Sequence, residues 1–349
     1  MGLRDLKWLT PEVERIQAAH RERVAALYRG EPLEDVIAIA GPLFGTNHGL
    51  AGTNQIDMLK DPDAWLDEVL SDMAARIEVA ADPITFQPLA IEIDPLGTHF
   101  IDALFGAEVG FHEGQVWSFP LRCDLSELSM PDLANSELLR ATLRLVRAAV
   151  SASQGRILIA APVLSCPINI GINLFGERLL EGLIEQPEET RRALRIITDV
   201  IIALTRIFIA EIPDEIRRTS VASSRYAPPG YGLIDGCATQ LVSREHYREF
   251  FAPLDAEILA VYPEHRGMIH LCGAHSQHIL LWREMEGLSS IQLNDRAAED
   301  LELYVKARRP DQIIYITPTP TMTVDRIMEI TKGERVILQC QLTERIPLK

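Results

Sequence analysis

The sequence predicts an α/β fold: a (β/α)₈ TIM barrel with N-terminal helices and an inserted β-hairpin region. Segments of strand character alternate with segments of helix character along most of the chain, which is typical of a parallel sheet. A length of 349 residues suits one barrel with additions better than an open sheet. No repeat, low-complexity stretch or clear linker divides the chain. We therefore predict a single barrel domain over residues 1–349, with residues 1–35 as an N-terminal helical extension.

The N-terminal half contains clear helix boundaries. Thr10 as N-cap, Pro11 at the first helical position and Gly30 after the end predict a helix between them. Asp61 and Pro62 begin a second helix in the same way. The other elements expected in this half are strands at 36–40 and 156–161, a β-rich and turn-rich section covering 84–94 and 115–124, and a long helix at 136–152.

The C-terminal half ends in four strand signals, each separated from the next by a helical segment. The strands are expected at 268–271, 289–293, 312–316 and 335–340. Before them we expect helices from near Phe175, from Pro187 and from Ser243, the last kinked at Pro253, and a β-like segment at 221–229. Residues 157–176 carry no charge, but their prolines and polar side chains favour a buried strand that runs into a loop over a membrane span.

Charge and cysteine usage narrow the class of protein. A net charge of −16 and a pI near 5.0, without any run of Lys and Arg, argue against nucleic acid and anionic membranes as partners. The N-terminal MGLRDLKWLT lacks the apolar core of a signal peptide. Five cysteines without a secretion signal fit a reducing compartment, where thiols fill the core, bind metals or act as nucleophiles. We expect a cytoplasmic protein.

The segment GMIHLCGAHSQH, residues 267–278, contains three histidines and a cysteine. His270 and Cys272 lie two residues apart at the carboxyl end of a strand, so both side chains point to the same face. Cys340 ends the last expected strand, and barrel closure brings such strand ends to one mouth. An imidazole and two thiolates suit zinc and leave a fourth position for water or substrate. The alternative is that all three are ordinary core residues.

Residues 155–340 resemble the uroporphyrinogen decarboxylase superfamily and, within it, the zinc-dependent corrinoid methyltransferases, which include the methylcobamide:coenzyme M methyltransferases. Residues 1–150 match only loosely. The resemblance is carried by APVLSCPINIGINLFGERLLEGLIEQPEETRRAL (161–194), GLIDGCATQLVSREHYREFFAPLDAEIL (232–259), and MIHLCGAH with the late VILQC. The first two stretches are similar to the superfamily at large, whereas the His-x-Cys followed by a late Cys is similar to the zinc ligands of the methyltransferases.

The resemblance implies a Zn²⁺ cofactor held by His270, Cys272 and Cys340. It also implies a methyl-corrinoid (methylcobalamin-type) cofactor, presented at the barrel mouth by a separate corrinoid protein. The zinc would lower the pKa of an incoming thiol, such as coenzyme M, and hold it as a thiolate that attacks the methyl group. A pterin acceptor such as tetrahydrofolate is the alternative, where chemistry at nitrogen requires proton transfer instead.

Three other interpretations of the same barrel are to be compared with this one. A uroporphyrinogen decarboxylase needs cations to hold the carboxylates of its tetrapyrrole substrate, yet no Lys or Arg occurs between Arg29 and Lys60, where the superfamily places an arginine-bearing loop. A non-catalytic barrel of the same family would have no reason to keep all three ligands. A zinc hydrolase would need a general base near the metal, and no HExxH motif is present.

Several further residues are candidates for the site. Asp295 is the better choice for a fourth zinc ligand, although it could equally cap the next helix. Asp235 falls where the superfamily lines its pocket, although Asp-Gly is also an ordinary turn pair. Asn47 and His48 could supply neutral donors in place of the missing arginines, although a loop with Gly45 and Gly49 also bends without any function. The remaining polar residues are assigned to packing or solvent: Cys123, Cys166 and Cys237 to the core or pocket lining, Gln339 to the barrel exterior, and His275 and His278 to solvated or capping positions.

Overall fold

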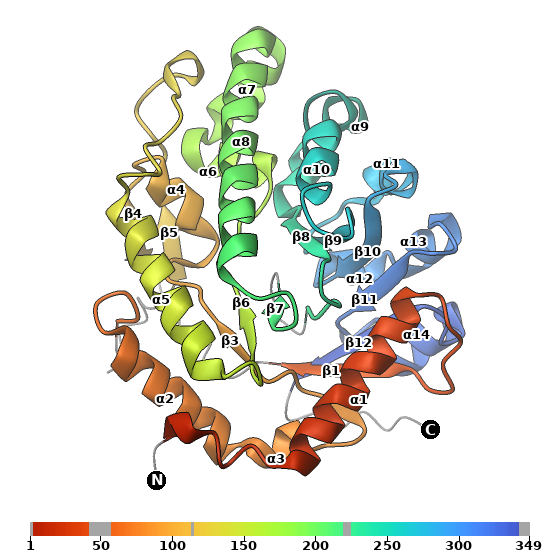
Figure 1. The fold of residues 1–349 in the computed structure, drawn as a ribbon. Helices are drawn as coiled ribbons and strands as arrows, with labels where there is room; N and C mark the ends of the chain where they lie inside the picture. Colours follow the sequence, from red (N-terminus) through yellow and green to blue (C-terminus); the bar gives the residue numbers. More distant parts are fainter. Residues whose placement is uncertain (1–2, 42–56, 113–114, 219–224, 342–349) are drawn as a thin grey trace.

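The computed structural model describes residues 3–41, 57–112, 115–218 and 225–341, and within them helices and parallel strands alternate (Figure 1). The strands are β1 (Ile37–Gly41), β2 (Thr85–Phe86), β3 (Ala90–Glu92), β4 (Val109–His112), β5 (Gln115–Ser118), β6 (Leu158–Ala160), β7 (Arg217–Arg218), β8 (Gly232–Asp235), β9 (Gly267–Leu271), β10 (Leu288–Leu293), β11 (Ile313–Ile316) and β12 (Val336–Gln341). The helices are α1 (Pro11–Tyr28), α2 (Pro62–Ala75), α3 (Ile77–Ala80), α4 (Phe100–Leu104), α5 (Glu137–Ser153), α6 (Pro167–Phe175), α7 (Glu177–Glu185), α8 (Pro187–Glu211), α9 (Arg244–His246), α10 (Ala252–Leu259), α11 (Ile279–Glu284), α12 (Arg296–Glu299), α13 (Leu301–Ala307) and α14 (Val324–Thr331).

The parallel strands form two sheets. The larger has seven strands in the order β2-β1-β12-β11-β10-β9-β8, and the smaller has three in the order β3-β6-β7. The strands β2 and β3 follow each other in the chain, so they connect the two sheets on one side. Among the described residues the strand pairs do not close a ring. The predicted barrel is therefore found as a barrel-like arrangement with the strands inside and helices outside, and not as a closed eight-stranded one.

One apolar cluster fills the space that both sheets enclose. It contains Ile39 of β1 and Met268 of β9 from the larger sheet, and Leu158 of β6 from the smaller sheet. A second, larger cluster contains residues of the opposite parity, such as Ile269 and Leu338, and lies between strands and helices. Because successive strand residues point to opposite faces, these two clusters identify the inner and outer face of each strand.

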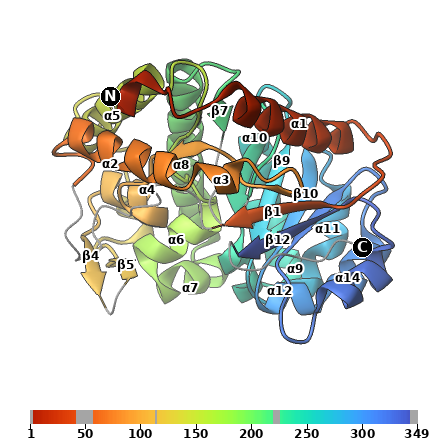
Figure 2. The ribbon, with the colours of Figure 1, turned by 90° about the horizontal axis from the view of Figure 1, so that it is seen from below.

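Helix α1 covers the amino ends of the strands, and its position follows from its sequence. Thr10 caps it through the amide of Val13, as predicted. Val24 and Leu27 pack into the inner cluster. The hydroxyl of Tyr28 is hydrogen-bonded to Ser290 Oγ at 2.9 Å. In Figure 2 α1 lies on the upper side of the molecule and the short helices α7, α9 and α12 on the lower side.

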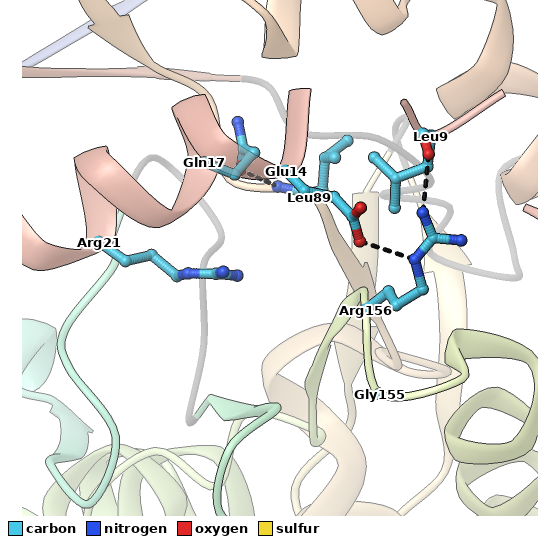
Figure 3. A pocket seen from close by; sticks show the side chains of 7 residues that line it. All are labelled: Leu9, Glu14, Gln17, Arg21, Leu89, Gly155 and Arg156. Carbon is cyan, nitrogen blue, oxygen red and sulfur yellow. Dashed lines mark hydrogen bonds and ion pairs between the residues drawn. The ribbon is translucent and has the colours of Figure 1, made fainter. Parts of the chain in front are cut away.

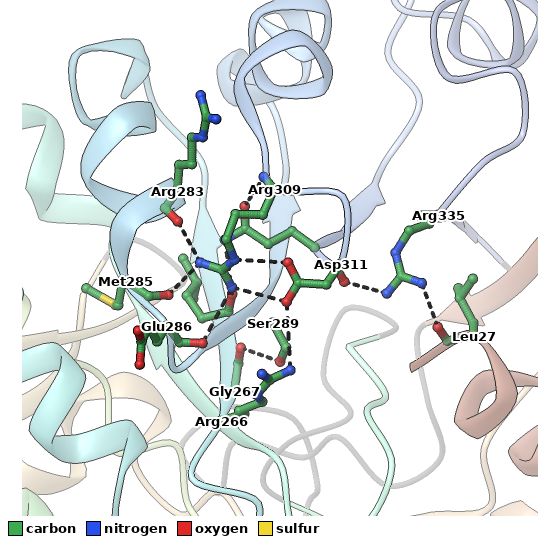
Figure 4. A network of polar contacts seen from close by, with 12 residues as sticks. Leu27, Arg266, Gly267, Arg283, Met285, Glu286, Ser289, Arg309, Asp311 and Arg335 are labelled. Carbon is green, nitrogen blue, oxygen red and sulfur yellow. Dashed lines mark hydrogen bonds and ion pairs between the residues drawn. The ribbon is translucent and has the colours of Figure 1, made fainter. Parts of the chain in front are cut away.

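An arginine network joins the loops at this amino end (Figure 4). The guanidinium of Arg309 donates to the carbonyl oxygens of Met285 at 2.8 Å and Leu288 at 2.7 Å, and to the carboxylate of Asp311 at 2.9 Å. Arg335 donates to the carbonyl oxygens of Leu27 and Asp311, which ties α1 to the same network. Backbone carbonyl groups that have no partner within a sheet are thereby satisfied.

A cavity of about 120 Å³ lies at the same end, next to α1 (Figure 3). Arg156 donates across it to Glu14 at 2.7 Å and to the carbonyl oxygen of Leu9 at 2.7 Å. Such a volume is well below the roughly 300 Å³ or more that small-molecule sites have. The cavity therefore belongs to the attachment of α1 and is no candidate for a cofactor site.

The structure differs from the predicted elements in several places, and residues 225–229 of the segment expected to be β-like form no strand. Residues 162–174, between the expected strand at 156–161 and the helix expected from near Phe175, were predicted to be a loop, but Pro167 starts helix α6 because proline suits the first helical turn. The kink expected at Pro253 takes the form of a π-helical turn at Tyr247–Phe251 that precedes α10. The inserted hairpin is confirmed as β4 and β5, which pair antiparallel. No helix in the described part of the chain has the length and apolar character needed to cross a membrane.

Candidate metal centre

Two neighbouring strands bring three soft donor groups together at their carboxyl ends. Strands β8 and β9 are parallel, with Asp235 opposite His270. Continuing the same register places Cys237, two residues after β8, beside Cys272. The ligand atoms of Cys237, His270 and Cys272 all lie within 4.8 Å of one another. We call these three residues the ligand group.

Short contacts hold the β8 end against the β9 end. The amide of Gly236 donates to the carbonyl oxygen of His270 at 2.8 Å, which extends the sheet pairing by one residue. A Cβ atom at Gly236 would lie 2.8 Å from the end of the Ile269 side chain, so the two strand ends pack closely there. The amide of Ala238, the residue after Cys237, donates to Asn169 Oδ1 at 2.8 Å. The backbone on both sides of Cys237 is therefore fixed.

The two thiols of the ligand group share one proton. Hydrogen bonds from Cys237 and His270 lower the pKa of Cys272 to about 5, whereas the hydrogen bond to Cys272, together with burial, raises the pKa of Cys237. Cys272 is thus a thiolate near neutral pH, and Cys237 donates its S–H to it. A thiolate is the form in which cysteine binds metals.

A chain of two amides orients the imidazole of His270. The side-chain oxygen of Gln292 is hydrogen-bonded to His270 Nδ1, and Gln292 Nε2 donates to Gln339 Oε1 at 2.8 Å. An amide oxygen can only accept, so Nδ1 carries a proton. Nε2 is then the ring nitrogen that bonds to Cys272, and its lone pair becomes available when a metal takes the place of that proton. Metal-binding histidines commonly donate their second ring nitrogen in this way.

Cys340 does not join the ligand group, although we predicted it as a zinc ligand. Its Sγ donates to the carbonyl oxygen of Ile39 at 3.5 Å. On β12, Ile337 belongs to the inner cluster and Leu338 to the outer one, so Gln339 shares the inner face and Cys340 the outer face. The prediction had assigned the two faces the other way round, with Gln339 outside.

The two candidate acids, Asp295 and Asp235, also lie outside the ligand group. Asp295 follows β10 with φ +46° and is exposed, and its carboxylate is not part of the ligand group. It precedes α12 without a side-chain capping hydrogen bond. Asp235 is buried at the end of β8 and forms an ion pair with Arg225 at 2.6 Å. Asn47 and His48 lie outside the described residues.

The two histidines that follow Cys272 are buried, and two further cysteines lie in or against the core. His275 and His278, expected to be solvated or capping, are both 0% exposed, and burial lowers the pKa of His275 to about 4. Neither belongs to the ligand group. Cys166 is fully buried in the outer cluster, as expected of a core residue, and Cys123 packs against the same cluster.

Cys237 is the member of the ligand group that sequence reasoning missed. We had assigned it to core or pocket lining because no cysteine or histidine lies near it in the chain. A signal existed, however. GLID is the strand that directly precedes MIHL, and consecutive strands of a barrel are neighbours. A cysteine two residues beyond the end of GLID is therefore expected beside the His-x-Cys of the next strand.

The chemistry of the ligand group fits zinc. Two thiol sulfurs and one imidazole nitrogen form a common catalytic zinc set that leaves one position open. In tetrahedral zinc sites neighbouring donors lie roughly 3.5–3.8 Å apart, from Zn–S bonds of about 2.3 Å and Zn–N bonds of about 2.0–2.1 Å. Donors within 4.8 Å of one another are therefore at most about 1 Å from that spacing. Among the described residues this is the one group of its kind.

Comparison with known proteins gives a fold relationship and no sequence family. No family model matches the chain, and no curated protein matches its sequence. A solved structure described as a methyltransferase from Methanosarcina mazei matches with a TM-score of 0.65 and 14% sequence identity. The match covers 94% of this chain and 95% of that one. Over nearly its whole length, the chain thus shares the fold of a protein that is a methyltransferase.

Proposed function

We propose that this protein is a zinc-dependent methyltransferase that moves a methyl group from a methyl-corrinoid, carried by a partner corrinoid protein, to a thiol acceptor. The observation that carries the proposal is the ligand group of two thiols and an imidazole at the carboxyl ends of β8 and β9. Active sites of barrels collect at that end of the strands. The shared fold with a methyltransferase supports the same reaction class.

In this proposal Cys237, His270 and Cys272 hold the metal, and Gln292 keeps His270 in the tautomer that leaves Nε2 free to bind. When bound, zinc keeps an incoming thiol deprotonated near neutral pH. The acceptor sulfur then forms a bond to the methyl carbon while the carbon–cobalt bond breaks, and the electron pair of that bond stays on cobalt. The thiol proton leaves to solvent, so the step is balanced without an external oxidant or reductant.

A thiol acceptor is favoured over a pterin by the surroundings of the ligand group. Acceptor chemistry at a pterin nitrogen needs a proton donor in the site. Asp235, the buried carboxylate nearest in sequence to Cys237, is held in an ion pair with Arg225 and is therefore not free to contact an acceptor nitrogen. A small thiol such as coenzyme M needs only deprotonation.

Metal analysis of purified protein tests the proposal. We expect close to one zinc per chain in the wild type and almost none in Cys237→Ser or Cys272→Ser. Cys340→Ser is the matched control, a buried cysteine of the same barrel outside the ligand group, and should retain the metal. Loss of zinc in Cys340→Ser with retention in Cys237→Ser would contradict the ligand assignment.

Activity is then measured as demethylation of methylcobalamin with a panel of thiols and with tetrahydrofolate. We expect turnover with at least one thiol in the zinc-loaded wild type and none in Cys272→Ser. Folded, zinc-loaded protein that demethylates methylcobalamin with no acceptor of the panel would reject methyl transfer as the function.

A further inference from the structure

A buried hydrogen-bonded hub connects the two loops that carry the thiols. Thr239 lies in the loop after Cys237, and His275 lies in the loop after Cys272. Both residues are 0% exposed. The hydroxyl of Thr239 is 2.9 Å from His275 Nδ1 and donates to the carbonyl oxygen of Gly236 at 2.8 Å. The two loops therefore contact each other directly through side chains.

The donors and acceptors in the hub are determined by chemistry. The amide of Gly273 donates to His275 Nε2 at 3.0 Å, so Nε2 carries no proton. His275 therefore carries its proton on Nδ1 and donates to the Thr239 hydroxyl oxygen, whose own hydrogen is used by Gly236. The carbonyl oxygen of Thr239 accepts from His278 Nε2 at 2.9 Å.

The hub connects residues that are direct neighbours of the two thiols along the chain. Gly236 directly precedes Cys237, and Gly273 directly follows Cys272. A continuous path runs from the Gly236 carbonyl oxygen through Thr239 and His275 to the Gly273 amide. A Cβ atom at Gly273 would lie 2.0 Å from Gln240, so the two loops also pack without space between them.

We propose that Thr239 and His275 are positioning residues that hold the Cys237 loop and the Cys272 loop at the spacing a metal ion requires. The inference rests on the proposed metal site but not on methyl transfer. Ordering a loop residue costs conformational entropy, and the hub meets this cost during folding, before any metal binds. Residues that orient metal ligands change metal affinity by about 10–100-fold when replaced.

Two single variants, their combination and one control test this inference. Thr239→Val keeps the shape but removes the hydroxyl, and His275→Phe keeps a buried ring but removes the acceptor for Gly273. The control is His20→Phe at the opposite end of the strands, where a buried histidine bonds only to the carbonyl oxygen of Asp82 and stacks on Phe86. It makes the same chemical change and should lower stability without touching the ligand group.

Two measurements are made on each variant: zinc affinity by competition with a chelator, and hydrogen exchange at the Gly273 amide in metal-free protein. We expect Thr239→Val and His275→Phe each to weaken zinc binding by about 10–100-fold. Exchange at Gly273 should become faster in His275→Phe. The double variant should lose no more affinity than the worse single variant, because both interrupt one path. His20→Phe should match the wild type in both measurements.

Zinc affinity that stays at the wild-type value in Thr239→Val and His275→Phe overturns the inference, even if Gly273 exchanges faster. An equal loss of affinity in His20→Phe overturns it too, because the effect would then be general destabilisation. A wild type that binds no zinc is a different result, which rejects the proposed function itself. Zinc binding without methyl transfer rejects the reaction and leaves the positioning role standing.

Discussion

The surroundings of buried polar side chains differ between the amino and the carboxyl ends of the strands. At the amino end Arg309 and Asp311 form a charged network with backbone carbonyl groups (Figure 4). Burial alone would raise the pKa of Asp311, but the hydrogen bonds and charge of Arg309 bring it below the usual value. Asp255 is connected to the Cys237 loop through Tyr247, whose ring contacts His278. It is fully buried, only Tyr247 donates to it, at 2.7 Å, and burial raises its pKa to about 7.

This difference separates a structural end from a candidate functional end. Charged hydrogen bonds at the amino end satisfy backbone groups and attach α1, which favours stability. At the carboxyl end histidines, amides and thiols lie around the proposed metal position, and the buried guanidinium of Arg225 is paired with Asp235. An unpaired positive charge there would compete with a metal. Variants at the two ends should therefore affect different properties of the protein.

Asp255→Asn should have the largest effect on stability. The folded state holds the carboxyl proton more tightly than the unfolded state, whose pKa is near 3.8. Stability from the protonated form is complete below that value and is lost as the pH rises to about 7, at about 1.4 kcal/mol per pH unit. Urea unfolding should show the variant gaining roughly 3 kcal/mol on the wild type between pH 5 and 8. A pH-independent difference would contradict this account.

Arg309→Ala should lower the free energy of unfolding by about 3 kcal/mol, because several carbonyl groups and Asp311 lose a charged donor. Zinc content should remain that of the wild type. Arg326→Ala is the control, since this exposed arginine only forms ion pairs with Glu302 and Glu329 and should cost less than about 1 kcal/mol. Loss of zinc in Arg309→Ala would show that the two ends are coupled.

Gln292→Ala should weaken zinc binding by about 10–100-fold, because His270 loses the acceptor that fixes its tautomer. Chelator competition measures the change. Gln312→Ala is matched to it, a buried glutamine at the amino end that donates to the carbonyl oxygens of Trp282 and Leu288. This control should reduce stability and keep the affinity, and equal affinities in both variants would remove Gln292 from the site.

Tyr28→Phe should have the smallest effect, about 1 kcal/mol of unfolding free energy, from the lost hydrogen bonds to Ser290 and Tyr315. Tyr304→Phe is the control, because the buried Tyr304 hydroxyl has no hydrogen-bond partner in the described structure. Its removal should cost nothing. A loss at Tyr304 as large as that at Tyr28 would show that the hydroxyl bonds of α1 do not contribute to the amino end.

The sequence by itself determined the local elements and two of the three members of the ligand group, His270 and Cys272. Caps and proline positions are local chemistry, so Thr10 and Pro11 correctly located α1. The spacing of His270 and Cys272 on one strand guarantees a common face, and the structure brings them together. The alternation of strands and helices indicated the barrel-like arrangement for the same reason, since each element is encoded by a short segment.

Only the tertiary structure decided which other cysteine stands beside them. On β12 the residues of both faces are buried, so the sequence RVILQC carries no inside–outside alternation to distinguish Gln339 from Cys340. The approach of Cys237 depends on the register of β8 against β9, which long-range backbone hydrogen bonds fix. The burial of His275 likewise depends on Thr239, 36 residues earlier in the chain. Face and register are properties of strand pairs, and a single strand does not encode them.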